Sequence, residues 1–111
     1  MTKIKDYFEI SSRNIYQLQK HEKEIDKICK AIINCKRNEN KILVCGNGGS
    51  CSDAEHFVGE LQCTYKSKNR KPISAFSLAS HPAALTAWSN DFGYLTYFKR
   101  QVQAHGKKDD I

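Results

Sequence analysis

Apolar residues recur at helical spacing along the first third of the chain. From Ile4 to Cys35 they leave gaps of three, four and seven residues, and no glycine or proline interrupts them. The pattern predicts either one long helix or two helices joined near His21. We expect its apolar stripe to be a packing or subunit-contact face rather than a ligand site.

The pattern changes after residue 38, where Asn38-Glu39-Asn40 indicates a turn. Residues 41–45 form a short apolar run that is typical of a strand buried on both faces of a parallel sheet. The glycine-rich stretch 46–50 (GNGGS) follows, and then a helical stretch over 52–62. Two pairs have capping-box spacing at the start of this helix, Ser52 with Glu55 and Ser50 with Asp53.

Strand and helix patterns alternate again in the second half of the chain. A strand is predicted at 73–77 and a helix at 82–89, with Pro82 at its first position and His81 helping to cap it. Asn90-Asp91-Phe92-Gly93 is predicted to end that helix. An amphipathic stretch then runs to a stop at Gly106, and Ile111 stands where a third strand would begin. The expected fold is α/β, a parallel sheet flanked by helices (39–111) after a helical segment (1–38).

Composition narrows the class of protein. A chain of 111 residues with 40% hydrophobic and 27% charged residues is one domain at most and is not expected to be disordered. No run has the length of a membrane span, and the N-terminus lacks a signal-peptide pattern, so a cytoplasmic location is expected. Five cysteines without a CxxC pair argue against a disulfide framework or a cysteine zinc site. We interpret most of them as small buried hydrophobic residues.

The formal net charge of +6 favours anionic partners, which include nucleic acid, phosphorylated metabolites and acidic membranes. Part of the charge lies in the segment 66–71, whose serine, asparagine and proline neighbours indicate a loop. We interpret this segment as a solvated loop rather than a nucleic-acid patch, because only Tyr65 offers a ring for base stacking there.

Three groups of residues could carry chemistry. The glycine loop can bring backbone amides close to a phosphorylated or polyhydroxylated ligand, or it can be a tight connection without a ligand. His56 and Glu60, one helical turn apart, can share one zinc ion or form an exposed hydrogen-bonded pair. Their place after the glycine loop, near the carboxyl edge of a parallel strand, favours a site. Asn90 and Asp91 could return to the same edge or simply form a turn.

Laid out in this way, the chain resembles the phosphoheptose isomerases. The resemblance lies in KILVCGNGGSCSDAEHFVGEL, in ALTAWSNDFGY and, more loosely, in FKRQVQAHGKKDDI, in the family's order and at similar separations. It implies a sugar-isomerase (SIS) fold and a homotetrameric aldose–ketose isomerase that converts sedoheptulose 7-phosphate to D-glycero-D-manno-heptose 7-phosphate for bacterial surface glycans. Neither a membrane nor nucleic acid is implied as a partner.

The resemblance also implies roles for particular residues. His56 and Glu60 match two zinc-binding positions, and Glu60 would also be the acid/base carboxylate. The substrate-contacting positions that match are Asn47, Gly48, Gly49, Ser50, Asn90 and Asp91. In chemical terms, isomerisation needs a base next to a carbonyl, and a metal can polarise that carbonyl.

Two departures from the family pattern qualify these expectations. Thr64 stands where many relatives have an arginine, which leaves the exact sugar open. The family's Ser/Thr-rich phosphate loop and its remaining zinc ligands, a glutamine and a histidine, would fall beyond Ile111, so the 111-residue chain is expected to show little or no turnover alone. The alternatives are a non-catalytic SIS-domain protein that binds or senses a sugar phosphate, and a nucleic-acid module that rests on charge alone.

Overall fold

The computed structural model describes residues 3–111, and the chain falls into two compact units, Met1–Ala31 and Ile32–Ile111. The first unit contains α1 (Ile4–Gln17), the short 3₁₀ helix η1 (Leu18–His21) and the start of α2 (Glu22–Arg37). Of the two predicted alternatives, the structure therefore contains two helices joined near His21 rather than one long helix. The apolar side chains of α1 lie in solvent, and Ile4, Phe8 and Ile15 are each about 70% exposed or more.

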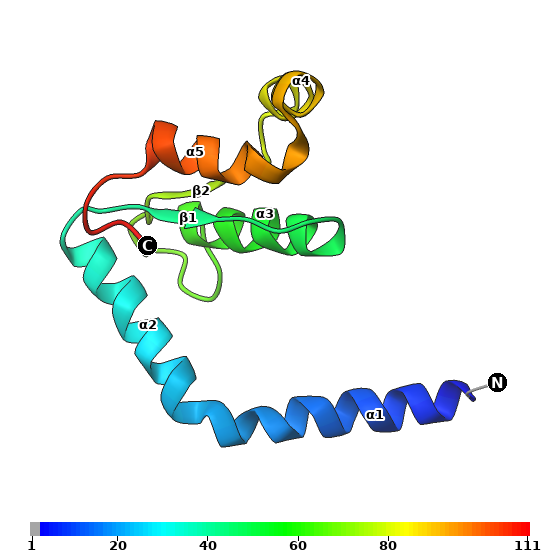
Figure 1. Cartoon of the computed structure of the whole chain (residues 1–111). Coiled ribbons are helices and arrows are strands. Elements are labelled where there is room, and N and C mark those ends of the chain that lie inside the picture. Colours follow the sequence, from blue (N-terminus) through cyan, green and yellow to red (C-terminus); the bar gives the residue numbers. More distant parts are fainter. Residues whose placement is uncertain (1–2) are drawn as a thin grey trace. The chain divides into compact units, whose positions relative to one another are not determined.

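The second unit is a small parallel sheet with helices on both of its faces (Figure 1). After α2 come β1 (Ile42–Val44), α3 (Gly49–Gln62), β2 (Ala75–Ser77), α4 (Pro82–Phe92), the 3₁₀ helix η2 (Tyr94–Thr96) and α5 (Tyr97–His105). The strands β1 and β2 run parallel, with Ile42 opposite Ala75. The predicted α/β class is confirmed.

Residue Ile111 pairs with the edge of β1 that β2 leaves free. The Leu43 amide donates to the Ile111 carbonyl over 2.6 Å, and the Ile111 amide donates to the Lys41 carbonyl over 3.2 Å, which is parallel pairing. β2 thus pairs with one edge of β1, and Ile111, later in the chain, pairs with the other edge. The loop that follows β1 therefore lies where the strand order reverses, the place where open α/β sheets bind ligands.

The core forms between the sheet, α3 and the end of α2. Its buried residues are Cys35, Ile42, Val58 and Ala75. Only Cys35 among the five cysteines is buried, and Cys29, Cys45 and Cys63 are exposed, so the interpretation of most cysteines as core residues is wrong. On α5, Tyr97 is fully buried and its hydroxyl donates to the Leu78 carbonyl over 2.9 Å, which fastens the start of α5 to the end of β2.

An ion pair joins the segment before β1 to the segment that leads to Ile111. The Lys41 ammonium donates to Asp110 Oδ2 over 2.6 Å, and the Lys41 backbone amide donates to Oδ1 over 2.9 Å. The amide of Lys107 donates to the same carboxylate over 2.7 Å. The hydrogen bond from the Lys41 side chain, with those from the two amides, lowers the pKa of Asp110 from its ordinary 3.8 to about 2.

Acid is expected to weaken this connection. Because the folded pKa of Asp110 lies below the unfolded value, its contribution to stability is complete above about pH 4 and is lost as the pH falls toward 2. The variant Asp110→Asn lacks that contribution at neutral pH and should lose less stability over this interval than the wild type. Urea unfolding of both proteins at several pH values measures the difference. Parallel pH dependences between pH 4 and 2 would contradict the assignment.

Within residues 3–111, no helix combines the length and the apolar character that crossing a bilayer requires.

Candidate functional site

The glycine loop joins β1 directly to the first turn of α3. A Cβ at Gly46 would lie 2.3 Å from the Ser50 carbonyl oxygen, so the backbones of these two residues approach too closely for any side chain. Gly48, with φ 57° and ψ −122°, is the N-cap of α3. The helix therefore begins three residues before the predicted Ser52, and its N-cap bears no side chain. Both predicted capping boxes are wrong, because their serines already lie inside the helix.

Because α3 begins at Gly49, the first backbone amides of the helix belong to the glycine loop. Gly49 and Ser50 occupy the first turn of α3, where amide groups have no carbonyl one turn earlier in the helix to bond to. The Ser50 amide donates to the Asn47 carbonyl over 3.0 Å, and the Cys51 amide donates to the Gly48 carbonyl over 3.0 Å. The bend is thus held by its own backbone, beside the partial positive charge of a helix N-terminus.

Asn90 and Asp91 belong to the last turn of α4 rather than to a turn after it. The helix continues to Phe92 and ends at Gly93, whose φ of 88° suits only glycine, so the predicted helix end at residue 89 is wrong. The Asn90 side-chain amide donates to Asp91 Oδ1 over 3.0 Å. The contact that joins this segment to the glycine loop comes from Tyr94, whose hydroxyl donates to Asn47 Oδ1. Sequence reasoning missed Tyr94.

His56 and Glu60 lie side by side on α3, as the spacing predicts. The distance from His56 Nε2 to Glu60 Oε1 is 3.2 Å, and the two side chains are 78% and 35% exposed. Together with Asp53, Phe57 and Tyr65 they line a shallow hollow. At 1.5 Å per residue, Glu60 is about 16 Å along the helix from Gly49. Glu60 is therefore near the end of α3 opposite the loop, and His56 lies near the middle of the helix.

The second oxygen of Glu60 points to a missing partner. Glu60 Oε2 is buried and accepts no hydrogen bond from residues 3–111. A buried carboxylate oxygen without a partner is costly, and a bound cation removes that cost. An imidazole nitrogen and a carboxylate oxygen are ligands that zinc accepts. Within residues 3–111, no third histidine, cysteine, aspartate or glutamate lies close enough to bind the same metal ion. His56 and Glu60 therefore fit zinc as two of its ligands.

Arg70 holds the helix end that carries Glu60. Its guanidinium donates to the carbonyls of Glu60 and Leu61, the latter over 2.7 Å, and to that of Lys71 over 3.0 Å. A cation at a helix C-terminus also interacts favourably with the helix dipole. The interpretation of 66–71 as a wholly solvated loop is therefore wrong for Arg70, which is half-buried. Thr64 donates its hydroxyl to the Ser67 carbonyl within this loop.

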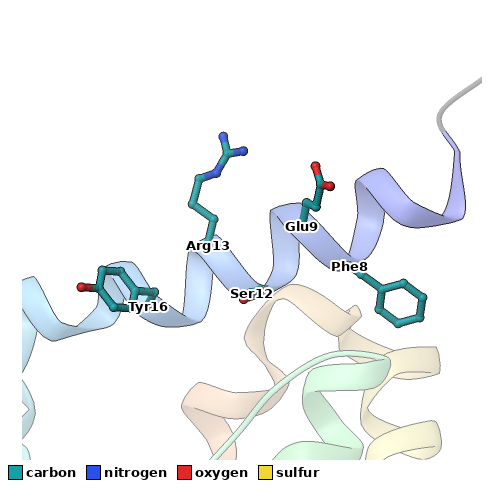
Figure 2. Close-up of a pocket in the computed structure, with 5 residues that line it drawn as sticks. All are labelled: Phe8, Glu9, Ser12, Arg13 and Tyr16. Carbon is teal, nitrogen blue, oxygen red and sulfur yellow. The ribbon is translucent and has the colours of Figure 1, made fainter.

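A hollow on α1 offers a contrast. It is lined by Phe8, Glu9, Ser12, Arg13 and Tyr16 (Figure 2). All of its side chains come from one face of a single helix and are exposed. The candidate site residues lie instead in the glycine loop, on α3 and in the last turn of α4.

Comparison with known proteins gives a consistent result. A sequence profile of the SIS domain family matches residues 6–111. A phosphoheptose isomerase of Helicobacter pylori is 52% identical over 80 residues, which are 72% of this chain and 41% of that protein. Phosphoheptose isomerase 1 of Campylobacter jejuni is 42% identical over 88 residues, 79% of this chain and 47% of the relative.

Solved structures extend the similarity to the fold. A phosphoheptose isomerase structure from Francisella tularensis superimposes with a TM-score of 0.91 at 36% identity, over 99% of this chain and 59% of the other. One from Neisseria gonorrhoeae gives a TM-score of 0.86 at 32% identity, over 96% of this chain and 55% of the other. The chain spans about half the length of these relatives.

Proposed function

Because the chain belongs to the SIS domain family, we propose that it supplies the glycine loop and the metal-binding helix of a phosphoheptose isomerase-type aldose–ketose isomerase. The reaction proposed is the conversion of sedoheptulose 7-phosphate to D-glycero-D-manno-heptose 7-phosphate, a cytoplasmic step toward bacterial surface glycans. The observation that carries the proposal is the buried oxygen of Glu60, unpartnered within residues 3–111, beside His56 on a helix that leaves the loop.

His56 and Glu60 are proposed to hold Zn²⁺ together. Bound there, the ion would supply a Lewis acid for the sugar carbonyl. The interaction between His56 Nε2 and Glu60 Oε1 fixes one oxygen of the carboxylate, and the other, Oε2, is buried and has no hydrogen bond from residues 3–111. The remaining ligands are proposed to come from outside residues 3–111, in keeping with the length of the relatives.

Glu60 is proposed to move the proton that isomerisation requires. An aldose and a ketose interconvert when a base removes a proton from the carbon next to the carbonyl and the conjugate acid returns it to the neighbouring carbon. Glu60 Oε2 can take and return that proton because no hydrogen bond within residues 3–111 already engages it. His56 and the backbone bonds from Arg70 keep the carboxylate in place meanwhile.

The loop is proposed to bind the oxygen-rich part of the substrate. The amides of Gly48 and Gly49 and the side chain of Asn47 offer donors to a phosphate or a sugar hydroxyl. Ser50 is proposed to contribute its hydroxyl, because its amide already donates to the Asn47 carbonyl. Asn90 and Asp91, at the end of α4, are proposed to contact the substrate as well. A homotetramer is proposed, with the exposed apolar residues of the segment 1–38 at a subunit contact.

A chimera provides the test of this function. Residues 1–111 are joined to the segment of the Helicobacter pylori phosphoheptose isomerase that follows the matched region. The chimera is expected to isomerise sedoheptulose 7-phosphate, whereas residues 1–111 alone show little or no turnover. His56→Ala should weaken zinc binding by at least about 10-fold, because even the outer partners of metal ligands are worth about 10–100-fold.

Glu55→Gln is the matched control, because Glu55 is an exposed carboxylate on the same helix. It should leave both zinc content and turnover unchanged. A folded chimera that binds the sugar phosphate without turning it over would contradict the isomerase and favour a binding or regulatory protein. Robust turnover by residues 1–111 alone would contradict the proposal that the site is completed from elsewhere.

A further inference from the structure

The position of the Asn47 side chain affects what the glycine loop can bind. A side-chain amide offers an accepting oxygen and a donating nitrogen, so it can add a hydrogen bond to those of the loop backbone. Asn47 is exposed at the bend before α3, so its own packing does not hold the side chain in one place. A specific partner is therefore needed to hold it beside the loop.

Tyr94 is that partner, although it lies 47 residues away in sequence. Its hydroxyl donates to Asn47 Oδ1, and this hydrogen bond ties the side chain to a second segment of the chain. Held there, the Asn47 amide lies beside the first turn of α3, so one ligand can bond to the side chain and to the backbone amides together.

Three neighbours keep the Tyr94 ring in place. Gly93, at φ 88°, turns the chain out of α4 so that the next residue faces the loop. The ring of Phe98, one helical turn later, meets the Tyr94 ring edge to face, with centroids 6.0 Å apart and planes at 75°. Tyr97 fastens the same segment to Leu78 at the end of β2. The Tyr94 hydroxyl is thus held by neighbouring residues that pack against the ring and anchor its backbone.

We propose that Tyr94 is a positioning residue, which holds the Asn47 side chain beside the glycine loop so that it hydrogen-bonds a sugar phosphate together with the loop amides. This inference rests on the proposed function for the identity of the ligand, but the contact between Tyr94 and Asn47 is a property of the chain. Tyr94 acts through Asn47 and needs no contact with the reacting atoms.

Tyr94→Phe removes only the hydroxyl and tests the proposal in the chimera. Loss of one hydrogen bond to a binding group should raise KM for sedoheptulose 7-phosphate by roughly 3- to 10-fold and leave kcat within about twofold. Asn47→Ala should raise KM further, and Tyr94→Phe should add nothing in the Asn47→Ala background, because both changes remove the same interaction. Additive effects of the two changes on KM would overturn the proposal.

A second measurement on residues 1–111 separates this inference from the proposed function. The ¹⁵N order parameter of Asn47 Nδ2 should be lower in Tyr94→Phe than in the wild type and should fall into the flexible range below about 0.6. Tyr7→Phe is the control: it removes the hydroxyl of an exposed tyrosine on α1, so it should leave the Asn47 order parameter unchanged. An unchanged Asn47 order parameter in Tyr94→Phe overturns the inference even if the chimera is active. If the order parameter falls as expected but the chimera neither binds nor isomerises the sugar phosphate, only the proposed function is overturned.

Discussion

Replacing Glu60 by glutamine is expected to lower kcat/KM of the chimera for sedoheptulose 7-phosphate by about 10²–10⁴-fold, the range for loss of a general base. Glutamine is nearly the same size as glutamate, but its amide does not accept the proton and is a poor ligand for zinc. The measurement is steady-state turnover with zinc in excess, together with the zinc content of each purified variant.

A stability measurement distinguishes this loss from misfolding. Because Glu60 Oε2 is buried and unpartnered within residues 3–111, Glu60→Gln should leave the zinc-free chain at least as stable as the wild type. Glu55→Gln, five residues earlier on the exposed surface of α3, should keep full turnover. Retention of activity by Glu60→Gln to within about tenfold would remove Glu60 from the chemistry.

Replacing Gly46 by alanine is expected to destabilise the chain by about 1–3 kcal/mol, the usual range for overpacking a well-packed site. The added Cβ would lie 2.3 Å from the Ser50 carbonyl oxygen and 2.5 Å from its carbonyl carbon, and both belong to backbone. The loop must therefore shift, and the donors at the start of α3 shift with it. Urea unfolding gives the loss of stability, and KM of the chimera reports the displaced loop.

Gly59→Ala is the matched control for Gly46→Ala. Gly59 lies inside α3, and no heavy atom outside its own helix turn and chain neighbours lies within 4 Å of a Cβ added there. Alanine is favoured over glycine in a helix, so this variant should gain about 0.5–1 kcal/mol. If the two substitutions change stability equally, the close approach of Gly46 and Ser50 does not constrain the loop.

The strand, loop and helix that carry the candidate site could be predicted from local sequence. The strand before the glycines and the helix after them are each determined by residues that are close in sequence, so their patterns can be recognised locally. The structure contains both elements, as β1 and α3. The proximity of His56 and Glu60 follows from helical geometry alone. Capping by His81 is also confirmed, because its Nδ1 accepts from the Ala84 amide over 3.2 Å.

The features that were missed depend on contacts between distant segments. The hydroxyl of Tyr94 reaches Asn47, and Arg70 folds back onto the end of α3, and no spacing rule links either pair. The sequence predicts too late a start for α3, because serine side chains outrank glycine as caps. In the structure, the close approach of Gly46 to Ser50 decides the geometry. Cysteine burial depends on which face of each element meets the sheet.

The account depends most directly on a zinc ion shared by His56 and Glu60. Anomalous diffraction from crystals of the zinc-loaded chimera, with data above and below the zinc absorption edge, locates that ion without reference to activity. The predicted result is one peak per chain within ligand distance of an imidazole nitrogen of His56 and a carboxylate oxygen of Glu60, about 2.0–2.2 Å from each. A zinc peak elsewhere, with these two side chains still bonded only to each other, would contradict the account.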